Sequence, residues 1–281
     1  MSIHIIVDSA SDITNHTRED VTVLPMTITF GNTQYQDGVD LSHQNFYEKL
    51  IESDELPTTS QIAPYDFEMA IKNVLSEETD VIVITMSSKL SGTYQSACIA
   101  ASEFEEKVYV VDSENVTVGE RALIEYALRL RDQGLDAASI VKELETEKKN
   151  IRLIALLDTL EYLKKGGRVG KATAFAGGIL SIKPVIAIEN GEVVFLGKAR
   201  GSKQGNNFLA QKIKESGIDS DKPYFLGYTG LNDTLLQKYI TDSKELWQDH
   251  AESLAISTVG GTIGTHVGPG AIAVAFFALN G

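Results

Sequence analysis

The sequence contains one cysteine, Cys98, among its 281 residues, so no disulfide can form within the chain. A single thiol fits a reducing compartment, and we expect a cytoplasmic protein in which Cys98 is a small buried side chain on a helix. Long hydrophobic runs are also missing: the longest, 271–279, has nine residues, whereas a membrane-spanning helix needs ~20. The first predicted strand begins at Ile3, which leaves no room for a signal peptide.

Positive charge is scarce, because 25 Lys and Arg residues accompany 39 Asp and Glu residues and the formal net charge is −14 at pH 7. Such a protein repels nucleic-acid phosphates, which argues against a DNA or RNA partner. The basic residues are nevertheless concentrated between Arg152 and Lys203, where nine of them accompany four acidic residues. We interpret this segment as one local contact with an anionic partner, and a lysine-rich solvated surface is the alternative.

The short motifs of common catalytic and metal sites are absent as well. The sequence has no G-x-S-x-G, no H-E-x-x-H and no C-x-x-C, and its His, Asp and Glu residues do not recur at metal-ligand spacing. The segment 166–172 superficially resembles a phosphate-binding loop, but its spacing and the residue after Lys171 do not fit. We therefore expect no metal and no cofactor, and the sequence favours binding over chemistry.

The most informative stretch that is present is TMSSKLSGTYQSA, residues 85–97. It follows the apolar run 81–84 and precedes an alanine-rich helical segment, which predicts a strand, a hydroxyl-rich loop and a helix. In an open α/β sheet, ligands bind at the carboxyl ends of strands, where helix amino termini also point. Five hydroxyl groups that could donate to an anion fall within nine positions: Thr85, Ser87, Ser88, Ser91 and Thr93. Ordinary helix capping would account for one or two of them.

Two further stretches could contribute to the same site. Residues 58–61, TTSQ, form a predicted polar loop held semi-rigidly between Pro57 and Pro64, so that two hydroxyl-bearing loops could clamp one ligand. His266 lies in the glycine-rich stretch 260–270, which we predict to be a loop before a buried strand. Its ring could reach a cavity, although a lone loop histidine is more often structural or solvated.

The order of predicted elements indicates the fold class. Apolar strands alternate with helical segments over the first 150 residues, which predicts a parallel sheet with helices on both faces. A charged helical segment ends near Asn150, and we place a domain boundary there. The second half begins with the strand-like run 152–157 and contains a hairpin signal at Asn190-Gly191. We therefore predict an α/β protein with two domains, residues 1–150 and 151–281.

Five stretches between Asp8 and Gly270 belong to a pattern that runs over residues 3–280. They are Asp8-Ser-Ala-Ser-Asp12, Pro57-Thr-Thr-Ser-Gln61, Ser88-Lys-Leu-Ser-Gly-Thr-Tyr-Gln95, Leu160-Glu-Tyr-Leu-Lys-Lys-Gly-Gly-Arg168 and His266-Val-Gly-Pro-Gly270. In order and spacing they resemble the DegV family of bacterial fatty-acid-binding proteins. The resemblance implies an N-terminal parallel-sheet α/β domain and a C-terminal mixed-sheet α/β domain, with one long-chain fatty acid between them. It further implies a protein that is not itself an enzyme but presents the fatty acid carboxyl group to a separate fatty acid kinase. The acyl phosphate would then feed phospholipid synthesis.

The resemblance also implies roles for individual residues. Thr59 and Ser91 would hold the carboxylate, and the other residues close to it would be Thr93, Arg200 and His266. The kinase-facing residues would be Lys164, Lys165 and Arg168. One departure from the family pattern is Gln204, where a basic residue is expected near Arg200.

A fatty acid such as hexadecanoate fits elementary energetics. Its tail has about fifteen methylenes, and burying them at ~0.8 kcal/mol each contributes roughly 12 kcal/mol before association costs. The small and apolar stretches 174–180 and 271–277 are suitable tunnel walls, with ordinary core packing as the alternative. An ionised carboxylate is costly to bury unless it is hydrogen-bonded, and hydroxyl donors meet that need.

Two other functional classes remain open. The chain could be a hydrolase or a small-molecule kinase that uses Ser91 as nucleophile or His266 as base, since the implied architecture resembles that of dihydroxyacetone kinases. It could also be a sensor that signals lipid status. We expect no stable membrane insertion, and a monomer.

Overall fold

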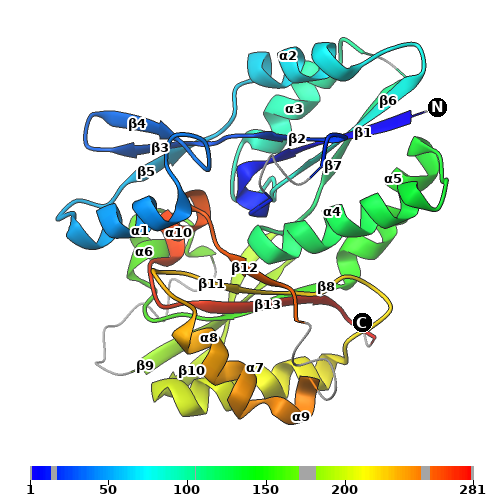
Figure 1. Ribbon diagram of the computed structural model, residues 1–281. Coiled ribbons are helices and arrows are strands. Elements are labelled where there is room, and N and C mark those ends of the chain that lie inside the picture. Colours follow the sequence, from blue (N-terminus) through cyan, green and yellow to red (C-terminus); the bar gives the residue numbers. More distant parts are fainter. Residues whose placement is uncertain (1, 14–17, 105, 171–181, 248–253, 280–281) are drawn as a thin grey trace.

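The computed structural model describes residues 2–13, 18–104, 106–170, 182–247 and 254–279. Within these ranges the chain forms two large β-sheets and one small one, with helices packed on them (Figure 1). The first large sheet has the order β2-β1-β6-β7, and every pairing in it is parallel. Its strands are β1 (Ser2–Asp8), β2 (Val21–Leu24), β6 (Thr79–Thr85) and β7 (Val108–Asp112).

Helices cover both faces of this parallel sheet, as the sequence predicted. α2 (Pro64–Val74) and α3 (Thr93–Ala101) lie on one face, and α4 (Thr117–Asp132) and α5 (Ala137–Glu147) lie on the other (Figure 1). The apolar run 81–84 is completely buried, which explains why it reads as a continuous hydrophobic segment rather than an alternating one. Asp8 is the carboxyl-terminal residue of β1, and the carboxyl end of β6 leads into the loop that carries Ser91.

The second large sheet contains both parallel and antiparallel pairings and has the order β10-β9-β8-β13-β11-β12. Its strands are β8 (Ile151–Leu156), β9 (Ile182–Glu189), β10 (Glu192–Arg200), β11 (Phe225–Tyr228), β12 (Ile256–Thr258) and β13 (Ile272–Phe277). β9 and β10 form the predicted hairpin, and both turn residues, Asn190 and Gly191, have the positive φ that this tight turn requires. The β11–β12 pair is parallel, whereas the other pairs are antiparallel.

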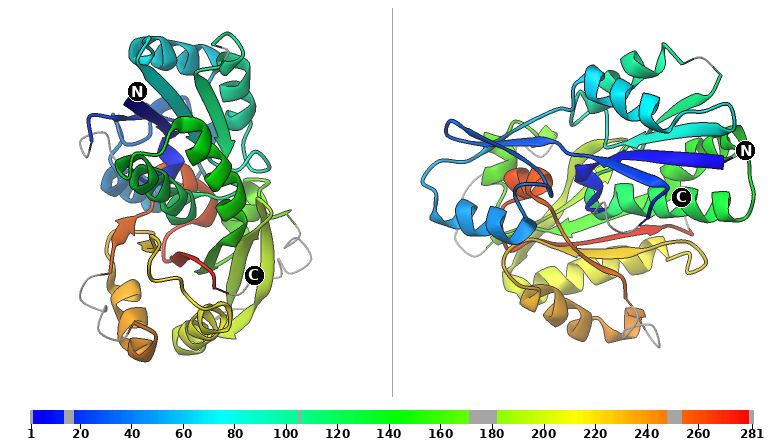
Figure 2. Two further views of the ribbon diagram at one scale, coloured as in Figure 1. Left: turned by 90° about the vertical axis from the view of Figure 1, so that its right-hand side faces the viewer. Right: turned by 45° about the horizontal axis from the view of Figure 1, so that its top comes forward.

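The two faces of this mixed sheet have different neighbours. Its outer face packs on α7 (Gly201–Ser216), α8 (Thr234–Asp242) and α9 (Lys244–Trp247), around a core that includes Trp247. Its inner face is turned toward α4, which lies between the two large sheets (Figures 1 and 2). The parallel sheet and the mixed sheet confirm the expected α/β fold class.

The strands of the first 150 residues belong to the parallel sheet and the small sheet, and the strands from Ile151 onward belong to the mixed sheet. The division into domains at residues 1–150 and 151–281 stays a prediction. In the described ranges, none of the helices combines the length and hydrophobicity that crossing a bilayer requires.

The small sheet corrects one expectation. Residues 58–61 were predicted to form a loop, but Thr58–Ser60 is a short strand, β5. It pairs with β3 (Thr27–Phe30), which also pairs with β4 (Thr33–Gln36), and Thr59 lies opposite Ile28. Threonine is compatible with a strand, but three polar residues between two prolines are too few to predict one, so pairing with β3 decides the conformation.

The glycine-rich stretch 260–270 corrects another expectation. It was predicted to be a loop, yet Gly261–Val267 is a helix, α10, which lies against α1 (His43–Glu52) and α6 (Glu161–Lys165) (Figure 1). A Cβ on Gly261 would lie 2.8 Å from Phe46 Cδ2, and one on Gly264 would lie 2.7 Å from Tyr47 Oη. These glycines therefore permit close helix packing, which in the sequence looks the same as flexibility.

Candidate functional site

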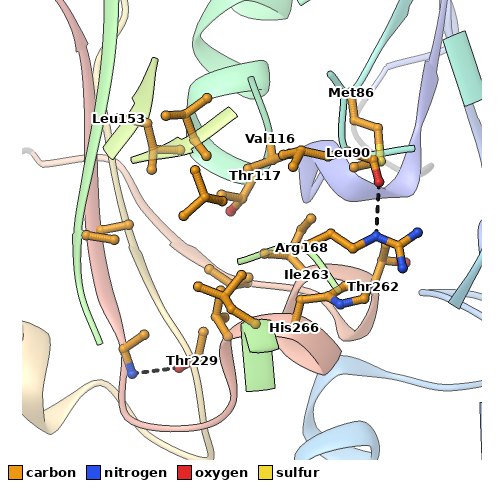
Figure 3. Close-up of a pocket in the computed structure, with 18 of the residues that line it drawn as sticks. Met86, Leu90, Val116, Thr117, Leu153, Arg168, Thr229, Thr262, Ile263 and His266 are labelled. Atoms are coloured by element: carbon orange, nitrogen blue, oxygen red, sulfur yellow. Dashed lines mark hydrogen bonds between the residues drawn. The ribbon is translucent and has the colours of Figure 1, made fainter. Parts of the chain in front are cut away.

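A cavity of about 370 Å³ lies between the inner face of the mixed sheet and the N-terminal elements (Figure 3). The sheet side contributes apolar residues from β8, β9, β10, β11 and β13, and the opposite side contributes the start of α4, the loop 86–92, β5 and α10. This volume falls within the ~300–1,000 Å³ of ordinary small-molecule sites.

A row of small residues makes room for the cavity. Gly227, Ala273 and Ala155 are register partners across the adjacent strands β11, β13 and β8, and all three line the cavity. Larger residues at these positions would project into the space, because side chains of paired residues point to the same face of a sheet. The alternate residues Val274 and Phe276 face the outer helices instead.

The predicted wall segments have different outcomes. In the segment 271–277, residues 271–273 line the cavity, and the rest of the strand is core. The other predicted wall, 174–180, lies outside the described residues.

Thr59 and His266 meet at one end of the cavity. A hydrogen bond of 2.9 Å joins Thr59 Oγ1 on β5 to His266 Nε2 on α10. His266 Nδ1 is buried and has no hydrogen-bond partner among the described residues. Burial, together with the smaller effect of the positive charge of Arg168, lowers the pKa of His266 to about 4. The ring is therefore neutral at pH 7.

Ser91 lies in the cavity wall immediately before α3. Its Oγ is 2.9 Å from Thr93 Oγ1 and accepts the Thr93 N–H at 3.3 Å. Thr93 is fully buried and is not among the described residues that line the cavity, so it supports Ser91 from behind. Gln61, the residue after β5, passes close to Gly92 and donates to Ser96 Oγ at 3.0 Å. The two hydroxyl-bearing segments are thus brought together in one wall.

Arg168 points inward, whereas the family resemblance implied that it faces a kinase. Its Nε donates to Leu90 O at 3.2 Å and its Nη1 donates to Gly166 O at 2.8 Å, and the half-buried side chain lines the cavity beside His266 (Figure 3). Gly166 makes room for this arrangement, because a Cβ there would lie 2.2 Å from His266 Nδ1. The sequence motif drew attention to Arg168, but not to the direction of its side chain.

Arg200 does not reach this site. It is exposed at the junction of β10 and α7 and is not among the described residues that line the cavity. Its N–H donates to Gln204 Oε1 at 3.0 Å, so Gln204 caps the start of α7. The expectation that Arg200 lies close to the ligand carboxylate therefore finds no support in its position. Lys164 and Lys165 are exposed on α6.

The described residues include no group of three or more His, Cys, Asp and Glu side chains arranged to hold a metal ion. The arrangement can instead surround an apolar molecule and offer it hydroxyl, imidazole and guanidinium groups. Neutral donors beside one cation suit an anionic head group.

Comparisons with known proteins match the chain over nearly its whole length. The model of the DegV family, described as uncharacterised proteins, matches residues 2–279. A DegV domain-containing protein of Caldanaerobacter subterraneus subsp. tengcongensis is 34% identical over 279 residues, which cover 98% of each chain. A Thermotoga maritima protein named as fatty acid-binding is 31% identical over 97% of this chain and 96% of its own. A solved structure, described as fatty acid binding of a DegV family protein from Thermus thermophilus, has a TM-score of 0.89 at 30% identity, covering 99% of this chain and 100% of that one.

Proposed function

This chain belongs to the DegV family, and we propose that it binds one long-chain fatty acid, such as hexadecanoate, in the cavity described above. The carrying observation is the cavity itself, whose walls are mainly apolar and whose lining includes Ser91 and the hydrogen-bonded pair Thr59 and His266. The relatives described as fatty-acid-binding proteins support the same ligand class.

The polar end suits a carboxylate. Thr59 and Ser91 have hydroxyl groups that can turn to donate to the two carboxylate oxygens. Neutral His266 can donate from one ring nitrogen and accept at the other. Arg168 supplies a positive charge close by, while two of its N–H groups are already held by backbone carbonyls. The carboxylate is therefore stabilised by several modest interactions rather than by one buried ion pair.

We further propose that the protein presents this carboxyl group to a separate fatty acid kinase in the cytoplasm, and that the acyl phosphate feeds phospholipid synthesis. Support comes from Lys164 and Lys165, which are exposed on α6 and lie only a few residues before Arg168 in the sequence. Two exposed cations beside the head group would attract an acidic partner and make the association sensitive to salt.

The alternative of an enzyme based on Ser91 or His266 is not favoured by the geometry. Ser91 Oγ pairs with Thr93, and His266 Nε2 pairs with Thr59. A histidine whose pKa is about 4 is a weak base at neutral pH. A carrier and a lipid sensor bind the same ligand and differ only in the step after binding, so a kinase assay separates them.

The test begins with mass spectrometry of the purified protein under denaturing conditions, which should release a fatty acid at about one equivalent. Adding ATP and a fatty acid kinase should then produce acyl phosphate. The double variant Thr59→Ala, Ser91→Ala should retain less lipid and support less phosphorylation. Its matched control is Thr58→Ala, Ser88→Ala, which removes exposed hydroxyls from the same two segments. Unchanged lipid retention and phosphorylation in the first variant would contradict the assignment of Thr59 and Ser91.

A further inference from the structure

Two buried carboxylates hold the start of α10. Asp37 Oδ1 accepts the N–H of Gly261 at 3.1 Å, and Asp37 Oδ2 accepts the N–H and the O–H of Thr262 at 3.1 and 2.6 Å. Asp12 Oδ1 accepts the N–H of Gly260 at 2.8 Å. Backbone N–H groups at a helix start have no partner within the helix, so these carboxylates determine where α10 begins.

The other end of α10 is held by the same small sheet. Asp37 follows β4 and donates its own N–H to Met26 O beside β3, at 2.9 Å. Thr59, on β5 of that sheet, hydrogen-bonds His266 near the end of α10. Between them, Ile28 of β3 packs against Gly261. The sheet β4-β3-β5 and the residue that follows it therefore contact α10 at both ends, through Asp37 at its start and Thr59 near its end.

The carboxylates themselves are separate from the cavity. Neither Asp12 nor Asp37 is among the described residues that line it, so any effect on a ligand must pass through α10. α10 has seven residues and is about 10 Å long, which is short enough to move as one rigid body. A displacement at Gly261 would consequently be carried to His266.

We propose that Asp37, assisted by Asp12, is a positioning residue for the head-group end of the cavity, because its hydrogen bonds to Gly261 and Thr262 keep His266 aligned with Thr59. This inference rests on the proposed function, since it assigns the aligned pair to carboxylate recognition. The inference gives a role to Asp12 and Asp37, which do not line the cavity and so cannot act by contacting a ligand there.

The test uses Asp37→Asn in the full chain. The new amide nitrogen cannot accept a hydrogen bond, so Gly261 or Thr262 loses its acceptor and α10 shifts. We expect the affinity for hexadecanoic acid to fall roughly tenfold, as for the loss of one hydrogen bond to a charged group. The affinity for hexadecan-1-ol should fall clearly less, because it loses only the apolar contacts with Ile263 and Val267 of α10. In a His266→Ala background, Asp37→Asn should cause no further loss, because the residue that it positions is gone.

The matched control is Asp40→Asn. Asp40 lies in the same turn and accepts the N–H of Gln36 at 2.6 Å, but it is exposed and bonds to no α10 group among the described residues. It should leave both affinities unchanged. Equal weakening of acid and alcohol by Asp37→Asn, or a full second loss in the His266→Ala background, would show that Asp37 acts only on overall stability.

A readout without lipid separates this inference from the proposed function. NMR titration of the His266 imidazole should show its pKa rising toward the ordinary 6.5 in Asp37→Asn and staying low in Asp40→Asn. If wild-type protein bound neither lipid while this shift occurred, the proposed function would fail and the alignment would stand. If Asp37→Asn does not fold, Asp12→Asn replaces it, with a smaller rise expected, and an unmoved His266 pKa would overturn the inference.

Discussion

Replacing His266 by glutamine should change how the stability of the ligand-free protein depends on pH. In the folded protein burial lowers the pKa of His266 from 6.5 to about 4, whereas in the unfolded chain the imidazole has its ordinary pKa. Between pH 6.5 and about pH 4, the imidazole is therefore protonated in the unfolded chain but neutral in the folded protein. Stability from this group is therefore complete above pH 6.5 and is lost as the pH falls toward 4.

The size of the effect follows from the two pKa values. Each pKa unit corresponds to about 1.36 kcal/mol, so a difference of roughly 2.5 units amounts to about 3 kcal/mol at pH 4 and about 2 kcal/mol at pH 5. The His266→Gln variant has no imidazole at this position, so its free energy of unfolding should not contain this pH-dependent loss. The free energy of unfolding of the variant should thus rise relative to wild type by about 3 kcal/mol between pH 7 and pH 4.

The free energy of unfolding of the variant must be subtracted from that of wild type, because two buried acids change the stability of both proteins with pH in the opposite direction. Burial raises the pKa of Asp8 to about 7 and that of Asp12 to about 6. For these groups the folded protein binds protons before the unfolded chain does, so their contribution increases as the pH falls from about 7 toward 3.8. In wild type alone they would mask the effect of His266, whereas subtraction of the variant removes them.

Urea unfolding followed by the fluorescence of Trp247, the single and buried tryptophan, supplies the measurement. Curves at several pH values between 7 and 4 give the wild-type-minus-variant difference. His4→Gln is a comparison at a half-buried histidine away from the cavity; burial also lowers the pKa of His4, so a smaller difference in the same direction is expected there. A difference that stays constant within about 0.5 kcal/mol across this range would refute the argument that burial keeps His266 neutral.

Three further predictions concern the cavity and its surroundings. Ala273→Leu, in the middle of the small-residue row, should favour fatty acids several carbons shorter, as measured by the chain lengths that co-purify; an unchanged profile would place the tail elsewhere. Gly166→Ala should displace His266 and weaken binding of hexadecanoic acid roughly tenfold. Gly167→Ala, where a Cβ meets nothing within 4 Å, should lower only stability, by about 1 kcal/mol, and equal binding losses would contradict the close approach at Gly166. Lys165→Glu should slow acyl phosphate formation at low salt and leave lipid retention intact, whereas a rate indifferent to this reversal would exclude α6 from the kinase contact.

Local patterns were a good guide where the physics is local. The buried run 81–84 and the turn at Asn190-Gly191 predicted a strand and a hairpin, because continuous burial and positive φ select particular residues. The hydroxyl-rich segments 58–61 and 85–97 were predicted to clamp one ligand, and the family resemblance singled out Thr59 and Ser91 within them; both residues line the same cavity. The helix at 261–267 was missed, since glycine that permits close packing has the same sequence signature as glycine that permits a turn.

The amino-acid sequence by itself determined the α/β class, the alternation of elements in the first half and two hydroxyl-bearing segments that line the cavity. Only the tertiary structure decided that Arg168 turns into the cavity while Arg200 remains exposed, and that Asp37 holds a helix that begins more than two hundred residues later. The reason is that segment identity depends on neighbours along the chain. The direction of a long side chain and the partner of a buried carboxylate depend on groups that only folding brings close.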